Sequence, residues 1–211
     1  MGKAKQGIYG PMKGKVGQVV WYELNGQCIA RGIGYRTAPR TEGEIESSKA
    51  HNLLTELFKP TQSFIKKGFG GLTKNTVHNY HNLAMSYNRS YAISADKQNP
   101  ALRFDQLLFS NGDLLQPINP ILEVVEHGLK ISWDFSMDDY IGMNDRVMML
   151  AYFPDNNQAI FETSGSKRSQ LSDILLLNTS MRSLPMHVYI AFGAKDDERV
   201  SCSTYLGSVN I

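Results

Sequence analysis

Hydrophobic and polar residues alternate along the second half of the chain. Leu129, Ile131, Trp133 and Phe135 are separated by polar residues, which is the period of a strand with one buried face. Further short apolar runs, separated by polar turns, lie at residues 147–153, 159–163, 171–177, 186–192 and 200–206. Short strands repeated in this way predict an antiparallel β-sandwich over residues 102–211.

The middle of the chain, residues 41–101, has the period of helices. Thr41 and Glu44 have the spacing of a capping box, and the apolar residues that follow predict a helix that ends at Pro60. Residues 61–67 predict a second short helix with Gly68 as its left-handed terminator. A third helix is expected from residue 73 to about residue 91. Its apolar and aromatic stripe consists of Val77, Tyr80, Ala84, Tyr87 and Tyr91.

Residues 1–40 are rich in glycine and carry two strand-like runs, at 16–22 and 28–33. Asn25-Gly26 between them is a strong signal for a two-residue hairpin turn. We expect a small β-hairpin behind a flexible basic lead, and such a hairpin must pack on something else because it cannot bury a core alone. The candidate interaction residues are Lys3, Lys5, Lys13, Lys15, Trp21, Arg31, Arg36 and Arg40.

The sequence therefore predicts an α+β protein with an N-terminal β-hairpin, helices and a C-terminal antiparallel β-sandwich. Trp133 on the second strand, residues 184–189 and the closing hairpin at 191–201 resemble a fibronectin type III or immunoglobulin-like domain. In such domains a tyrosine near the start of the penultimate strand bonds back to the main chain, and Tyr189 is the candidate. The resemblance implies that Trp133 and Tyr189 belong to the sandwich core.

A second resemblance covers nearly the whole chain. The opening Gly7-Ile-Tyr-Gly-Pro-Met-Lys-Gly-Lys-Val-Gly-Gln-Val-Val-Trp21 is similar to a family of uncharacterised Bacteroidota proteins, which begin G-I-x-G-x-x-x-G-K-V-G-x-V-V. In that family a helix of Pro-Arg-Thr type and a β-sandwich follow, and residues 36–42 and 87–88 look like the matching inner motifs. The resemblance implies an architecture and carries no activity.

The net charge of +2 conceals an uneven distribution. Residues 1–110 carry 15 Lys or Arg and 7 Asp or Glu, a net of +8, whereas residues 111–211 carry 7 and 13, a net of −6. Two cysteines are too few for a disulfide scaffold, and no apolar run approaches the roughly 18 residues of a membrane span. The N-terminus lacks the pattern of a signal peptide, so we expect a cytoplasmic protein, with signal-independent export or incorporation into a particle as the alternatives.

The candidate chemistry is thin. The glycines and lysines at 10–17 lack the Ser or Thr of a phosphate-binding loop, His78 and His81 have no visible third metal ligand, and the acidic residues at 138–145 lack calcium-loop spacing. Cys28 has no base placed beside it by the sequence. We therefore predict no catalytic, cofactor-binding or metal-binding residues, and a protein that is not an enzyme.

Three functions fit these features. The leading hypothesis is a non-catalytic structural, assembly or protein-interaction protein that binds itself or another protein, as a component of a filament, a virion-like particle or an injection-type machine. The first alternative is a nucleic-acid-binding protein that uses the basic N-terminal half. The second is surface or carbohydrate recognition through the sandwich loops, which would require an exposed Trp133. The sequence leaves any small-molecule partner unknown.

Overall fold

The computed structural model describes residues 3–4, 10, 12–24, 26–74, 76, 78–135, 142–196 and 198–210. The chain divides into two compact units, Met1–Thr41 and Glu42–Ile211. Each unit is described by itself below.

The first unit is a four-stranded antiparallel sheet with the order β1-β2-β3-β4. Its strands are β1 (Lys3–Ala4), β2 (Met12–Val16), β3 (Val19–Leu24) and β4 (Gln27–Gly32). The expected hairpin is confirmed as β3 and β4, although Asn25 lies outside the described residues. The prediction of a flexible basic lead was wrong for the described residues of that segment, because they form β1 and β2. Gly17, at φ +58°, supplies the left-handed residue that a tight turn between β2 and β3 needs.

The second unit contains two antiparallel sheets that form the expected sandwich. The larger sheet has the order β11-β10-β7-β8 and the smaller one the order β5-β6-β9. The strands are β5 (Ile118–Val125), β6 (Gly128–Asp134), β7 (Arg146–Phe153), β8 (Gln158–Glu162), β9 (Ser172–Leu176), β10 (Met186–Gly193) and β11 (Thr204–Val209). Short helical turns lie in the connections at η1 (Phe104–Gln106), η3 (Arg168–Gln170) and α3 (Thr179–Arg182).

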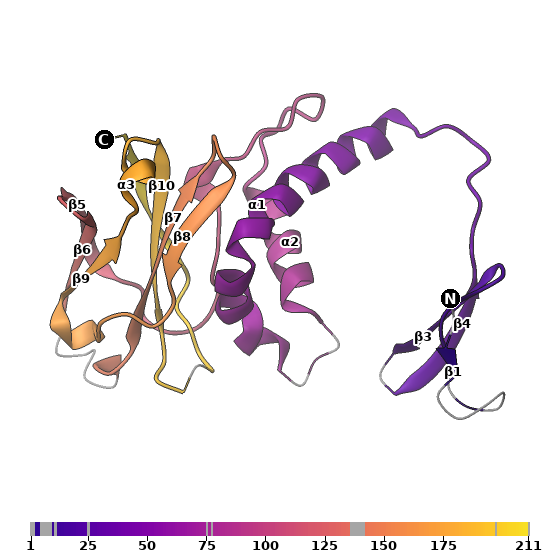
Figure 1. Cartoon of the computed structure of the whole chain (residues 1–211), viewed down its shortest axis with the longest axis horizontal. Coiled ribbons are helices and arrows are strands. Elements are labelled where there is room, and N and C mark those ends of the chain that lie inside the picture. The colour runs from indigo at the N-terminus through magenta and orange to yellow at the C-terminus, as the bar shows by residue number, and fades with distance from the viewer. Residues whose placement is uncertain are drawn as a thin grey trace. The chain divides into compact units, whose positions relative to one another are not determined.

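Two helices cover the four-stranded sheet on the side away from the three-stranded sheet. They are α1 (Glu42–Thr73) and α2 (Tyr80–Tyr91), and Figure 1 shows them on one side of β7 and β8, with β5, β6 and β9 on the other. Met148, Leu150 and Tyr152 of β7 pack with the helices, and Val147 and Met149 pack toward the smaller sheet. Strand β7 is therefore covered on both faces, which explains its continuous apolar run.

Helix α1 passes through Pro60 without ending, so the expected break and the separate helix over 61–67 were wrong. Leu57 and Phe58 before Pro60, and Phe64 and Ile65 after it, are all buried. Burial contributes about 1.5–3 kcal/mol for each such side chain, which outweighs the roughly 3 kcal/mol that an interior proline costs a helix. Tertiary packing therefore decides the length of this helix.

Helix α2 begins later than expected, after Asn79, whose side chain accepts a hydrogen bond from the His81 backbone N–H. The expected stripe is confirmed at Ala84, which is buried, and at Tyr80, which packs against the core. It is wrong at Tyr91, which is 58% exposed, and the other buried residues of the helix are Met85 and Asn88. The Asn88 amide donates to the carbonyls of residues 84 and 108 and accepts from the N–H of residue 108. The buried side of α2 therefore includes a polar residue whose hydrogen bonds are satisfied by backbone groups. Val77 lies outside the described residues.

Gly68 lies inside α1 and does not terminate it, which corrects the expected left-handed cap. A Cβ at this position would lie 2.3 Å from the Phe109 carbonyl oxygen and 2.7 Å from the Ser110 Cβ. The Asn111 N–H also donates to the Gly68 carbonyl at 3.0 Å. The glycine is therefore required for the close approach of the segment that leads from the helices to the sandwich.

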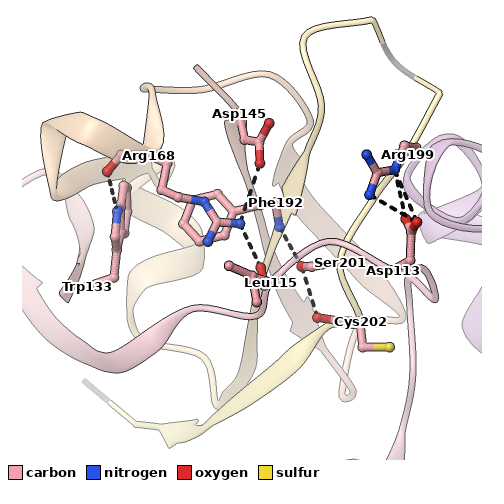
Figure 2. A network of polar contacts seen from close by, with 9 residues as sticks. All are labelled: Asp113, Leu115, Trp133, Asp145, Arg168, Phe192, Arg199, Ser201 and Cys202. Atoms are coloured by element: carbon pink, nitrogen blue, oxygen red, sulfur yellow. Dashed lines mark hydrogen bonds and ion pairs between the residues drawn. The ribbon is translucent and has the colours of Figure 1, made fainter. Parts of the chain in front are cut away.

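A buried arginine closes one end of the sandwich (Figure 2). The guanidinium of Arg168 lies 3.9 Å from the centre of the Phe192 ring, donates to the Leu115 carbonyl at 2.6 Å and pairs with Asp145 at 3.6 Å. The Trp133 indole N–H donates to the Arg168 carbonyl at 2.7 Å. Because Trp133 belongs to β6 and Phe192 to β10, this residue joins the two sheets.

Gly68→Ala is expected to lower the free energy of unfolding, measured by chemical denaturation. Alanine is favoured over glycine by up to about 1 kcal/mol inside a helix, but here the added methyl meets backbone that cannot rotate away. Gly70→Ala is the matched control, since nothing lies within 4 Å of a Cβ built there, and it should leave stability unchanged or raise it. Equal effects of the two substitutions would contradict the close-approach argument.

Arg168→Met is expected to cost about 3 kcal/mol of unfolding free energy, because it leaves the Leu115 carbonyl and Asp145 without their buried donor. Arg199→Met is the control. Arg199 also pairs with a carboxylate, Asp113 at 3.0 Å, but both side chains are more than half exposed, so no measurable change is expected. Similar losses in both variants would show that burial does not set the contribution of Arg168.

Candidate interaction surface

The N-terminal sheet has no core of its own among its described residues. Every side chain of residues 3–41 whose burial is described is exposed or half-buried, and the buried residues of the structure belong to the second unit. A sheet in water needs a hydrophobic face packed against another element to be stable. This unit therefore forms a sheet, but its described residues include no second layer that would bury one face of that sheet.

Strand register divides the side chains between the two faces of the sheet, and both faces carry apolar residues. Residues directly opposite each other in an antiparallel pair point to the same side, and successive residues alternate. Trp21 lies opposite Gly14 and Ala30, and Val19 lies opposite Val16 and Gly32. We call this side the Trp21 face. It carries Met12, Val16, Val19, Trp21, Cys28 and Ala30, together with one carboxylate, Glu23.

The opposite side, which we call the lysine face, collects the cations. Val20 lies opposite Lys15 and Arg31, and Lys3 lies opposite Lys13. Tyr22 is on the same side, with the guanidinium carbon of Arg31 5.9 Å from its ring centre. The Lys and Arg residues of the described strands are all on this face. Two further cations, Arg36 and Arg40, lie after β4, where Arg36 donates to the carbonyls of residues 38 and 39.

The expected interaction residues are thus divided between two faces. Lys3, Lys13, Lys15 and Arg31 come together, whereas Trp21 lies on the other side of the sheet; Lys5 lies outside the described residues. The signal for this division was the strict alternation of Met12-Lys-Gly-Lys-Val16, which has the period of a strand. The glycines masked it, because they suggested a flexible lead.

The two units carry opposite charge. Residues 1–41 contain seven Lys or Arg against the single Glu23, a net of +6, and residues 42–211 contain the other 15 against 19 Asp or Glu, a net of −4. The boundary between the compact units therefore divides the chain into a cationic and an anionic part.

The second unit has an apolar sheet face of its own, on the side of β5, β6 and β9 that points away from the four-stranded sheet. Leu129, Ile131 and Leu175 point inward, so their strand neighbours point outward. Ile121 is 58% exposed, Ile174 47% and Leu176 68%. We call this the outer sheet face; it consists of Ile121, Glu123, Val125, Lys130, Ser132, Ser172, Ile174 and Leu176.

Trp133 and Tyr189 are both buried, in different layers. Trp133 packs edge-on against Phe192 between the two sheets, so the aromatic that carbohydrate recognition would need at the surface is 3% exposed. Tyr189 lies on the helix side of β10, and its hydroxyl donates to the Phe104 carbonyl at 2.8 Å. The bond does reach back to the main chain, but to a segment 85 residues away instead of a local corner. Burial raises the pKa of this phenol, which keeps it protonated as a donor.

The positions considered for metal or catalytic chemistry lie apart. Within the described ranges no three His, Cys, Asp or Glu side chains form a metal-binding group. His78 is exposed, and His81 packs edge-on against Phe58 at 5.8 Å. Cys28 is exposed, with its thiol 3.5 Å from the Met12 carbonyl oxygen. Asp138 and Asp139 of the acidic loop lie outside the described residues.

An open groove of about 490 Å³ lies between β8 and β9, the outermost strands of their two sheets. The charged side chains at its base hold the intervening loop: Arg146 donates to the Gly165 carbonyl, and Asp173 accepts from the Ser166 N–H. These groups are occupied in maintaining the loop. The groove therefore gives no ligand chemistry to propose.

A family model described as a family of unknown function, DUF6266, matches residues 10–207. The match spans the N-terminal sheet from β2 onward, both helices and nearly all of the sandwich. The Bacteroidota origin and the Gly-rich motif remain predictions. No curated protein and no solved structure matches the chain. No helix in the described part of the chain is long and apolar enough to cross a membrane.

Proposed function

We propose a function for this chain, which belongs to the DUF6266 family, from its own surfaces: it is a non-catalytic assembly protein that joins a protein partner through the Trp21 face. The single observation that supports this proposal is a four-stranded sheet with an apolar face and no buried side chain among its described residues. The role fits a component of a filament, a virion-like particle or an injection-type machine.

Part of the apolar area on the Trp21 face is not covered within its own unit. Burying apolar surface contributes about 25 cal/mol per Å². On this face Val16 is 52% exposed, and Met12, Val19 and Trp21 are partly exposed, so apolar area is left for a partner to cover. Trp21 lies on a central strand of the sheet, with Gly14 and Ala30 beside it, so its ring stands above small neighbours. Tryptophan at the centre of a flat apolar face is typical of the residues that dominate protein interfaces.

The second unit supports the same role as a rigid body. Three layers pack on one another around β7 and β10, and the buried polar residues in the core hold backbone instead of presenting reactive groups. A body of this kind presents surfaces at fixed positions, which is what an assembly subunit requires. The N-terminal sheet then provides the contact.

Trp21→Ser is expected to abolish association of the full chain, measured by light scattering after size exclusion over a range of protein and salt concentrations. The matched control is Tyr22→Ser, which removes the neighbouring aromatic from the lysine face and should leave association unchanged. A wild-type chain that stays monomeric at high concentration and low salt, and that mild cross-linking in its source cell joins to no protein, would refute the proposal.

The alternative function, nucleic-acid binding, is favoured by one observation: Lys3, Lys13, Lys15 and Arg31 share a face with Tyr22. Cations beside a stacking ring are the groups that single-stranded nucleic acid requires. This proposal uses the face that the assembly role leaves open.

The alternative is tested by titrating a fluorescent single-stranded oligonucleotide at several salt concentrations. Binding should weaken with salt, and the double variant Lys13→Gln, Lys15→Gln should reduce the slope of log affinity against log salt by about 1–2. Lys130→Gln in the second unit is the control and should leave the slope unchanged. An affinity that does not change with salt concentration would reject nucleic acid as the ligand. So would an affinity that is the same in the double variant and in the Lys130→Gln control.

A further inference from the structure

We propose that the partner of the Trp21 face is the outer sheet face of a second copy of this chain, so that copies join head to tail. The inference rests on the proposed function and names its partner. It follows from two apolar sheet faces on one chain that differ in residues, in charge and in the unit that carries them.

The outer sheet face is a flat receptor made of three rows of residues across the strands. Ile121 lies opposite Ser132, and Ser132 opposite Ser172, in the first row. The second row contains Glu123, Lys130 and Ile174, and the third contains Val125, Gly128 and Leu176. On the central strand β6 this face has Gly128, Lys130 and Ser132, so the exposed aliphatic side chains lie on the two outer strands. A projecting aromatic ring on a facing sheet fits such a surface, because sheets that pack face to face interdigitate about 10 Å apart.

Charge selects this pairing over the two symmetric ones. Two Trp21 faces in contact would bring together two units of net charge +6, whereas the Trp21 face on the outer sheet face brings +6 to −4. The strands β5, β6 and β9 with the turn at 126–127 carry four carboxylates and one lysine, so the second unit is anionic at this sheet as well. The cations of the N-terminal strands lie on the lysine face, behind the contact, and act on it at longer range. Opposite charge on two facing surfaces accelerates and orients association, and like charge opposes it.

The few charges inside the two faces are complementary as well. Glu23 is the carboxylate of the Trp21 face, and Lys130 is the cation of the outer sheet face. Lys130 is 41% exposed and bonds to Glu123 at 3.2 Å, so it reaches solvent from the middle of the receptor. A facing Glu23 would extend this pair without leaving a charge buried alone.

A head-to-tail contact has a consequence that a symmetric dimer lacks. After each contact the growing assembly would keep one unused face of each kind, one at either end, so that addition continues until a ring closes or an open filament forms. The assembly role would then rest on one repeating contact between two different surfaces.

The test uses two variants that each damage one side of the contact, Trp21→Asp and Leu176→Asp. Each alone should remain at the 23.6 kDa of one chain in light scattering, because its self-contact lacks one partner face. Mixed in equal amounts, they should form a species of twice that mass and no larger, since the intact Trp21 face of one variant meets the intact outer sheet face of the other. Wild-type protein should form larger species whose proportion falls as salt rises.

Two substitutions control for the introduced charge: Val20→Asp on the lysine face of β3, and Ile45→Asp at a 43% exposed position of α1. Both should assemble as the wild type does. Ile121→Asp provides a second variant on the receptor and should behave as Leu176→Asp; neither depends on the folding of the N-terminal sheet. Far-UV circular dichroism and thermal unfolding verify that each variant is folded.

The outcomes separate this inference from the function on which it rests. If the wild type associates and Trp21→Asp does not, while Leu176→Asp and Ile121→Asp assemble normally, the receptor is wrong and the assembly role stands. A symmetric dimer, or a mixture of the two variants that stays monomeric, also overturns the head-to-tail contact. A wild type that is monomeric at every protein and salt concentration overturns it as well. This holds also if the chain is monomeric because its own two faces contact each other.

Discussion

The second unit depends on one constraint, which is that the four-stranded sheet must be covered on both faces. Strands β7 and β10 are apolar on both sides, so neither the three-stranded sheet nor the helices alone would remove their side chains from water. This requirement explains why α1 is long and continues through Pro60. It also explains why the segment at residues 109–110 lies so close to the helix at Gly68. The three layers thus form one cooperative body.

The other two sheets differ from it. Each has a face with apolar residues that is not covered within the described part of its own unit. On the three-stranded sheet, inward Leu129 and Ile131 are fully buried while outward Ile121 and Leu176 are more than half exposed. On the N-terminal sheet even the inner strand β3 has no buried residue. Sheet faces with several exposed apolar side chains are candidates for contact with a partner.

The sequence predicts those features that depend on local pattern. The sandwich strands could be located from their period, and the hairpin from Asn25-Gly26, because both signals lie within a few residues. Strand β5 was not predicted, because Pro120 and the left-handed Asn119 interrupt its pattern with a bulge. Pro60 and Gly68 were misinterpreted, and the burial of Asn88 was not predicted, for a different reason. Gly68 and Asn88 meet partners 20 or more residues away, which no local rule contains.

Only part of the candidate surface could be predicted from the sequence, for the same reason. The cations could be named from the sequence, but their separation from Trp21 needs the register of β2, β3 and β4. The outer sheet face could not be found from the sequence, because β5 was missed and β6 and β9 have the ordinary pattern of half-buried strands. The division also argues against a single mixed basic and aromatic arm. With Trp21 facing one way and the lysines the other, one side of the sheet can be buried in a protein contact while its charge stays in water, so apolar adhesion and electrostatic orientation do not compete for the same residues.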